Sequence, residues 1–251
     1  MNDSPLVLSI FPGIGMLDHA FELEGFCVVR GPDVIWGGDI RRFHPPPGRF
    51  EGVIGGDPCQ SHTALVSMVR AKGLEPSFPD MTPDFQRVVE ESQPKWFLRE
   101  NVRLAPDIKP AGYDVRVFNL DNSTLDSGTG TGNEQMRTRR FWFGTQGPCP
   151  ELRQWIDFAM NISLDRVTAV GGHDGIADAL GDKAYRKARA EGEDYKPPHR
   201  DLAEMLRLQG LPGDWLDHQP WTMQAKRKMI GNGVAVPMGR ALARAIRKAI
   251  S

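Results

Sequence analysis

Short apolar runs alternate with helical stretches over the first half of this 251-residue chain, and no other feature restricts its fold as much. The runs that read as strands are residues 6–11, 27–29, 53–55 and 96–98, and the stretches with helical spacing are residues 16–25 and 83–92. Strands that alternate with helices are typical of a parallel or mixed sheet that carries helices on both faces. We therefore expect an α/β fold.

The strand pattern continues to about residue 144 and then changes. Two more strands are predicted at residues 115–120 and 138–143, joined by a Ser-, Thr- and Gly-rich loop at 122–132 that we expect to be mobile. We interpret residues 1–144 as the core of the protein.

The second half is divided between a small lobe and a returning segment. Polar helical stretches are predicted at 151–160 and 183–193, with a glycine-rich interruption at 171–175 between them. Order is regained with helices at 201–209, which has Asp201 near its cap, and at 236–250. We expect a small lobe at 145–198 and a C-terminal segment at 199–251 that packs back onto the core.

Composition and charge exclude several classes of protein. No apolar run approaches the ~20 residues needed to span a bilayer, and the N-terminus has no basic region followed by an apolar one. The three cysteines are scattered and form no CxxC pair, which argues against a disulfide framework and a structural zinc site. We expect a cytoplasmic protein with no metal and no membrane partner. Because the net charge is −1, any contact with nucleic acid must come from local basic clusters.

Chemically versatile side chains follow two of the predicted strands. Cys59 lies in a Gly- and Pro-rich turn just past residues 53–55, and Glu100 follows residues 96–98. Open α/β sheets place their chemistry at such strand ends, so we interpret the thiol as a candidate nucleophile and the carboxylate as its acid partner. The glycines of residues 11–15 follow the first strand, where backbone N–H groups can cradle a nucleotide-type cofactor. The third glycine of the dinucleotide fingerprint is missing, which counts against a nicotinamide enzyme.

Seven short motifs occur in one order along nearly the whole chain. They are Phe11-x-Gly13-x-Gly15, Gly38-Asp39-Ile40, Pro58-Cys59-Gln60, Glu100-Asn101-Val102, Gln135-x-Arg137-x-Arg139, Leu208-Gln209-Gly210 and Gly231-Asn232-Gly233-Val234. This set resembles the cytosine-5 DNA methyltransferases. The resemblance implies a Rossmann-like S-adenosylmethionine-dependent methyltransferase sheet, in which residues 1–144 hold the catalytic and cofactor-binding core and residues 145–198 form an unusually small target-recognition lobe.

The resemblance also implies how the catalytic residues act. Cys59 attacks C6 of a flipped-out cytosine, and C5 then takes the methyl group of S-adenosylmethionine. Glu100 holds N3 and N4 of the base, and Arg139 contacts O2. Arg137 supports the same pocket, and we expect it to share a strand face with Arg139 because the two residues alternate. We also expect the turn or nearby cations to favour the thiolate of Cys59.

The implied cofactor site draws on four parts of the chain. Its residues are Phe11, Gly13, Gly15, Asp33, Asp39, Ile40, Pro58, Asn232 and Val234. Phe11 would stack on adenine, Asp39 would accept from its amine, and Asp33 is our choice for the ribose hydroxyls. Two residues depart from the family pattern, because Met16 stands where glycine is usual and Asp57 where a second proline is common. We expect Asp57 to point away from Cys59.

The implied partner is double-stranded DNA, bound by a monomer. We expect residues 61–72 to form a mobile loop that closes over the DNA, in which His62 is a loop residue or phosphate contact rather than a general base. Residues 226–228 and the basic face of the last helix are candidate phosphate contacts, and the alternative for that helix is a solvated face. The small size favours an orphan modification enzyme of a phage or prophage. The alternatives are a tRNA cytosine-5 methyltransferase, a non-catalytic DNA-binding protein on this fold and, remotely, a nicotinamide oxidoreductase.

Overall fold

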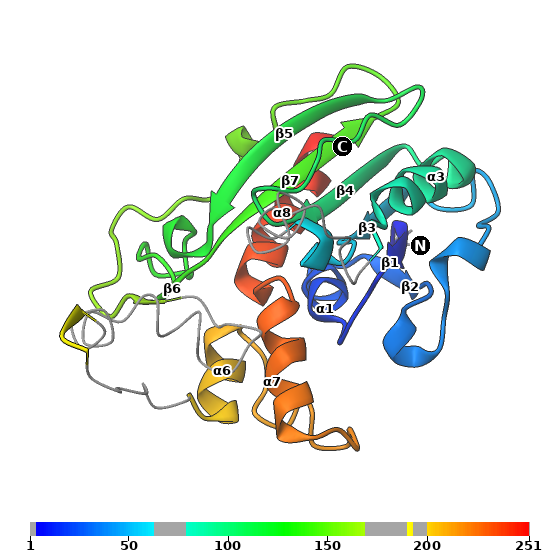
Figure 1. The fold of residues 1–251 in the computed structure, drawn as a ribbon. Helices are drawn as coiled ribbons and strands as arrows, with labels where there is room; N and C mark the ends of the chain where they lie inside the picture. The colour runs from blue at the N-terminus through cyan, green and yellow to red at the C-terminus, as the bar shows by residue number, and fades with distance from the viewer. Residues whose placement is uncertain (1–3, 63–78, 169–189, 193–199, 251) are drawn as a thin grey trace.

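A six-stranded mixed sheet forms the centre of the protein (Figure 1). The computed structural model describes residues 4–62, 79–168, 190–192 and 200–250. The strands of the sheet are β1 (Leu6–Ile10), β2 (Cys27–Arg30), β3 (Gly52–Gly55), β4 (Trp96–Asn101), β5 (Asp114–Asp121) and β7 (Thr138–Thr145), in the spatial order β2-β1-β3-β4-β7-β5. The first four are parallel, and β7 runs antiparallel to both β4 and β5. A separate pair joins β6 (Gln135–Met136) to β8 (Val167–Thr168).

Helices cover both faces of this sheet. The α-helices are α1 (Met16–Leu23), α3 (Thr82–Ser92), α6 (Leu202–Leu208), α7 (Met223–Asn232) and α8 (Val236–Ile250). Short 3-10 helices are η1 (Val34–Trp36), η2 (Ile40–Arg42), η3 (Cys59–His62), η4 (Asn122–Thr124) and η5 (Leu152–Trp155). In Figure 1, α3 lies on one side of the parallel strands, and α1 and α8 lie on the other.

The central strands are apolar on both faces because both faces are covered. Trp96 and Leu98 of β4 pack into the cluster under α1 and α8, whereas Phe97 between them packs against Phe85 and Val88 of α3. Burial on both sides explains why β3 and β4 read as short continuous apolar runs rather than alternating patterns.

The C-terminal segment returns to the core as expected. Helix α8 crosses α1 so closely that a Cβ on Gly239 would lie 2.6 Å from the Cβ of Ala20. Glu24, the residue after α1, accepts hydrogen bonds from Arg240 and Arg244 through its carboxylate and from Arg247 through its carbonyl. These three arginines of the basic face of α8 are thus held by Glu24, which favours a paired surface over the phosphate contacts that we predicted for it.

Most predicted strands and helices are confirmed among the described residues. One predicted helix and one predicted loop, both C-terminal to β5, differ from the expectation. The predicted helix at 151–160 is wrong, because only η5 forms there and Phe158 instead bridges to Leu125. The loop at 122–132 is tied down rather than loose, since the Asp126 carboxylate accepts from the N–H groups of Gly128 and Gly130. The stretches at 171–175 and 183–189 lie outside the described residues. Among the described residues, no helix has the length and apolar character to cross a membrane.

Candidate active site

A cavity of about 580 Å³ opens at the carboxyl ends of β1, β3 and β4. This is the edge where open α/β sheets bind ligands. Nine of the predicted site residues line it, namely Phe11, Gly13, Asp33, Pro58, Cys59, Glu100, Arg139, Asn232 and Val234. Residues from both ends of the chain meet here because α7 and the turn after it pack beside the loop that follows β1.

Cys59 is the first residue of η3 and is half-buried at the cavity wall. Burial raises the pKa of its thiol, and the Glu100 carboxylate raises it further. Arg139 and Arg137 act in the opposite direction without cancelling these effects. The cations therefore act on the thiolate in the expected direction, but desolvation and Glu100 outweigh them and the pKa of the thiol stays raised.

Glu100 faces the cavity from the end of β4 and is paired with Arg139. The Nε atom of Arg139 lies 2.8 Å from Oε1 of Glu100. Burial nevertheless raises the pKa of the Glu100 carboxyl, because the guanidinium groups around it compensate only in part. A Cβ on Gly56 would lie 2.8 Å from Oε2 of Glu100, so only glycine leaves room for this carboxylate.

Arg137 and Arg139 do not share a strand face, which corrects the sequence prediction. Arg137 lies in the break between β6 and β7, so the chain direction changes between the two arginines. Its Nη2 atom donates to the carbonyl groups of Gly231 and Gly233, each at 2.7 Å. Burial and the neighbouring Arg139 lower the pKa of this guanidinium well below its ordinary range. Arg137 lies outside the cavity lining and braces the turn that carries Asn232.

Asp57 directs its carboxylate away from Cys59, as expected. Burial alone would raise its pKa, but the hydrogen bonds from Arg99, together with His62 at 3.8 Å, outweigh that effect and hold the pKa at about 2. Arg99 Nε donates to Oδ1 at 2.6 Å, and Nη2 donates to Oδ2 at 2.8 Å. The negative charge beside the thiol is thus neutralised by a buried cation.

The loop after β1 is shaped by left-handed backbone and by Asp33. Gly13 has a φ of 56° and Gly15 a φ of 78°, a region that favours glycine. Asp33 accepts from the N–H of Gly13 at 2.9 Å, and the Trp36 ring nitrogen donates to the carbonyl of Gly13 at 2.9 Å. Gly15 caps α1 and stands just outside the cavity lining, against the guanidinium of Arg30.

The structure does not bring Asp39 and Ile40 to the cavity wall. Asp39 caps η2 and forms a two-point ion pair with Arg41, at 2.9 Å for each contact. Ile40 is buried in the cluster of α3. Arg41 lines the cavity instead. Local capping engages the Asp39 carboxylate and core packing engages Ile40, so their contact with a cofactor stays a prediction.

Several residues that line the cavity belong to none of the seven motifs. Asp18 of α1 is fully buried at the cavity floor, where it accepts from the Ser9 hydroxyl at 2.5 Å and pairs with Arg30 at 2.9 Å. Burial raises its pKa from 3.8 to about 6. An acidic residue on the buried face of an amphipathic helix was the available signal. Lys228 of α7 also lines the cavity.

Two glutamines of the sequence motifs, Gln135 and Gln209, connect elements around the cavity through hydrogen bonds. Gln135 donates to the carbonyl of Leu208 at 2.8 Å, and Gln209 donates to the carbonyl of Ile230 at 2.7 Å. Both side chains are buried. They join β6 to α6 and α7, and so place the Asn232 turn at the cavity.

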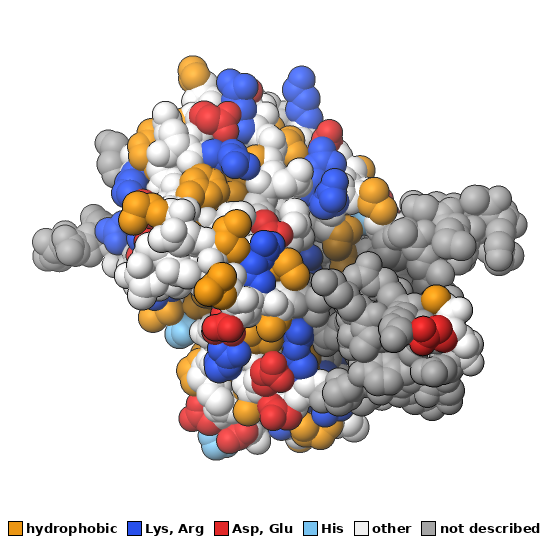
Figure 2. All heavy atoms as spheres, turned by 90° about the vertical axis from the view of Figure 1, so that its left-hand side faces the viewer, with side chains coloured by type: hydrophobic (Ala, Val, Ile, Leu, Met, Phe, Trp, Pro, Cys, Tyr) orange, Lys and Arg blue, Asp and Glu red, His pale blue; other side chains and the backbone are white. Residues whose placement is uncertain are grey.

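Basic side chains on the surface are mixed with acidic ones. On the face of the molecule that Figure 2 shows, Lys and Arg are interspersed with Asp, Glu and apolar side chains over the described residues. Arg140, for example, pairs with Asp107 at 2.8 Å. Of the loop predicted at 61–72, only Ser61 and His62 are described, and both are buried.

Comparison with known proteins identifies what this arrangement is similar to. The family model of the C-5 cytosine-specific DNA methylases matches residues 36–169 and 178–248. The type II methyltransferase M.NgoPII of Neisseria gonorrhoeae is 28% identical over 169 residues, which are 55% of this chain and 47% of that protein. The chain thus spans about half the length of this curated relative.

Two solved structures share the fold at low sequence identity. The methyltransferase EhMeth of Entamoeba histolytica superimposes with a TM-score of 0.61 at 11% identity, over 100% of both chains. A mutant of DNMT2 from Spodoptera frugiperda gives a TM-score of 0.60 at 13% identity, over 99% of this chain and 100% of that one. These likenesses establish a methyltransferase-type α/β sheet.

Proposed function

The chain belongs to the C-5 cytosine-specific DNA methylase family, and from this premise we propose that it transfers a methyl group from S-adenosylmethionine to C5 of cytosine in duplex DNA. The observation that carries the proposal is the meeting of Cys59, Glu100 and Arg139 with a glycine-turn loop around one cavity of about 580 Å³. A nucleophile, a carboxyl group and a cation, brought together from different strand ends beside a cofactor-sized space, suit addition to a heteroaromatic ring.

The residues around the cofactor half of the cavity fit S-adenosylmethionine. When bound, this molecule supplies a methyl group on a positively charged sulfur. Phe11 offers an aromatic surface at the cavity wall, and the carboxylates of Asp18 and Asp33 offer acceptors for cationic or hydroxyl groups. The tight contact of Met16 with Gly233 closes this half, since a Cβ on Gly233 would lie 2.1 Å from the Met16 sulfur. Met16 departs from the family pattern, and the absence of a side chain at Gly233 leaves the space that the Met16 side chain occupies.

Cys59 acts by adding its sulfur to C6 of the base as a thiolate, after its proton has left. The new S–C6 bond moves electron density to C5, which becomes able to accept a methyl group. Loss of the C5 proton and breakage of the S–C6 bond then restore both the aromatic ring and the free thiol. The step needs a thiolate, yet the pKa of Cys59 is raised in the ligand-free site.

Glu100 offers a solution to that requirement. Its own pKa is raised, which favours the protonated form that can donate to N3 of the base. Its ionised form is also one of the groups that raise the pKa of Cys59. When Glu100 shares a proton with the base, the negative charge next to the thiol is reduced, and Arg139 then favours the thiolate. Binding of the base and activation of the nucleophile are coupled in this way.

Cytosine in a duplex cannot reach a half-buried thiol at a strand end, so the base must leave the helix. Covalent trapping tests the proposal directly. A duplex with 5-fluorocytosine at target positions should form a stable adduct with the wild-type protein when S-adenosylmethionine is present, because fluorine cannot leave C5 as a proton does. Cys59→Ser should form none, and the matched control Cys27→Ser, at an exposed position, should react like the wild type.

Labelled methyl groups distinguish the substrate classes. Transfer from labelled S-adenosylmethionine to duplex DNA supports the proposal, and transfer to tRNA alone overturns its DNA part. If neither substrate is methylated and no adduct forms across a plasmid-length set of sequences, the chain is a non-catalytic member of its family. Bisulfite sequencing of plasmid from an expressing host then reports the target sequence.

A further inference from the structure

We propose that the buried ion pair of Asp57 and Arg99 is a positioning device that fixes the Cys59 turn against the strand that carries Glu100. Arg99 and Asn101 flank Glu100 on β4, and both bind Asp57. Arg99 is fully buried between Phe85 and Trp142, away from the cavity lining, whereas Glu100 and Asn101 both line the cavity. The inference deepens the proposed function and rests on it.

Arg99 and Asn101 bind Asp57 through its side chain and its backbone, respectively. Arg99 makes two charge-assisted hydrogen bonds to the carboxylate, at 2.6 and 2.8 Å. Asn101 Nδ2 donates to the backbone carbonyl of Asp57 at 3.1 Å. Only Pro58 separates Asp57 from Cys59, so β4 fixes the chain immediately before the thiol.

Arg99 is itself held so that its guanidinium cannot swing. It is fully buried, lies 4.5 Å from the ring centroid of Trp142, and donates to the carbonyl of Pro106 at 2.7 Å. Thr82 completes the arrangement, since its hydroxyl accepts from Arg99 at 2.9 Å and donates to Asp57 at 3.2 Å. The guanidinium of Arg99 therefore has one fixed orientation, in which its Nε and Nη2 donors face the Asp57 carboxylate.

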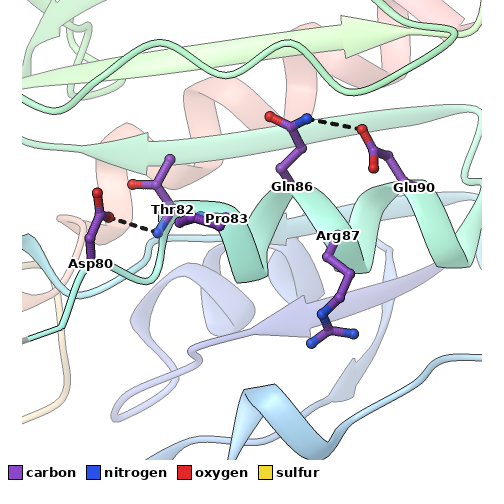
Figure 3. Close-up of a pocket in the computed structure, with 6 residues that line it drawn as sticks. All are labelled: Asp80, Thr82, Pro83, Gln86, Arg87 and Glu90. Atoms are coloured by element: carbon purple, nitrogen blue, oxygen red, sulfur yellow. Dashed lines mark hydrogen bonds between the residues drawn. The ribbon is translucent and has the colours of Figure 1, made fainter.

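The same network joins the turn to the start of α3. His62, at the end of η3, lies 3.2 Å from both the Asp80 carboxylate and the Thr82 hydroxyl. Figure 3 shows Asp80 bonded to the backbone N–H of Thr82 at the edge of a second cavity, of about 280 Å³, along α3. Both ends of η3 are thus anchored, through Asp57 before it and His62 at its last residue.

A metal ion is the alternative occupant of this cluster. Asp57, His62 and Asp80 each offer one ligand atom, all within 4.8 Å of one another. Both oxygens of Asp57 already accept from Arg99, however, and its guanidinium charge repels a cation. The pair therefore favours an ionic clamp over a metal site.

Three variants and a control test the clamp. Asp57→Asn and Arg99→Gln each break the pair, and Thr82→Val removes the bridging hydroxyl with little change of shape. Arg240→Gln, which breaks an exposed pair to Glu24, is the control. Because a misplacement of about 1 Å can cost about 100-fold, we expect kcat for DNA methylation to fall about 100-fold in the first two variants, with KM changed less than about twofold. In Thr82→Val, kcat should fall about tenfold. The double variant with both Asp57→Asn and Arg99→Gln should have a kcat no lower than either single variant.

Alkylation of Cys59 gives a readout that is independent of methylation. With iodoacetamide and peptide-resolved mass spectrometry, Cys59 should react at least about threefold faster in Asp57→Asn and Thr82→Val, because the turn is loosened and, in the former, a negative charge is removed. Exposed Cys27 is the reference within the same molecule and should not change.

The outcomes separate this inference from the proposed function. Altered Cys59 alkylation in a protein without methylation activity supports the clamp and overturns the function. Wild-type kcat and alkylation in folded Thr82→Val overturn the clamp, even if Arg99→Gln fails to fold. Loss of activity on treatment with EDTA, restored by a divalent cation, overturns it in favour of a metal site.

Discussion

Asp18 provides a sharp test of the electrostatics of the cavity floor. Its carboxyl is fully buried beside Ser9 and Arg30, and burial raises its pKa from 3.8 to about 6. We expect Asp18→Asn, which keeps the shape and still accepts from Ser9, to become more stable relative to the wild type as the pH rises.

The sign and the size follow from linkage. Between the unfolded pKa and the folded pKa of Asp18, the native state binds more protons than the unfolded state, so wild-type stability falls with rising pH. With pKa values of 3.8 and about 6, the cost of ionising Asp18 is about 2 kcal/mol at pH 5 and about 3 kcal/mol at pH 7. Asn does not titrate. The difference in unfolding free energy between variant and wild type should therefore shift by about 1 kcal/mol in favour of the variant between these pH values.

Urea unfolding of the ligand-free protein at pH 5, 6 and 7 measures this shift. Other titrating groups are common to both proteins and cancel in the difference. Loss of the ion pair with Arg30 in the variant adds a constant to the difference in unfolding free energy. The change of that difference with pH is therefore the informative quantity. A difference that stays constant, or that moves against the variant as pH rises, would refute the assignment of Asp18 as a buried carboxyl with a raised pKa.

Three further predictions concern the rest of the site. Arg139→Gln removes the cation that is paired with Glu100 and should lower kcat/KM for methylation about 100-fold, with an unchanged Kd for S-adenosylhomocysteine by calorimetry. Gly233→Ala should lower the free energy of unfolding by about 1–3 kcal/mol, because its Cβ overlaps the Met16 sulfur, and the double variant with Met16→Ala should lose less than the sum of the two single losses in urea titrations. Lys228→Ala should reduce the salt dependence of DNA binding by about one unit of slope, whereas Arg240→Gln, already paired with Glu24, should leave it unchanged in fluorescence anisotropy.

Local patterns determined most of the fold. The apolar runs at β1, β3 and β4 are short and continuous because each strand packs between helices, and this signal is present in the sequence itself. The last helix was predicted with its observed bounds, Val236–Ile250, because 15 residues of regular spacing leave little ambiguity. The stretch at 151–160 was wrongly predicted as a helix, because Leu152, Trp155 and Ile156 have helical spacing and pack against the core but form only a short 3-10 turn.

The sequence by itself determined the order of the elements and placed Cys59 and Glu100 at strand ends, since both follow from local spacing. Only the tertiary structure decided which charges meet. Asp57 is neutralised by a residue 42 positions away, and Arg137 reaches carbonyl groups more than 90 positions away. Asp33, rather than Asp39, lines the cavity for the same reason. The strength of a charge–charge contact depends on distance and burial, and both are set by how the whole chain packs.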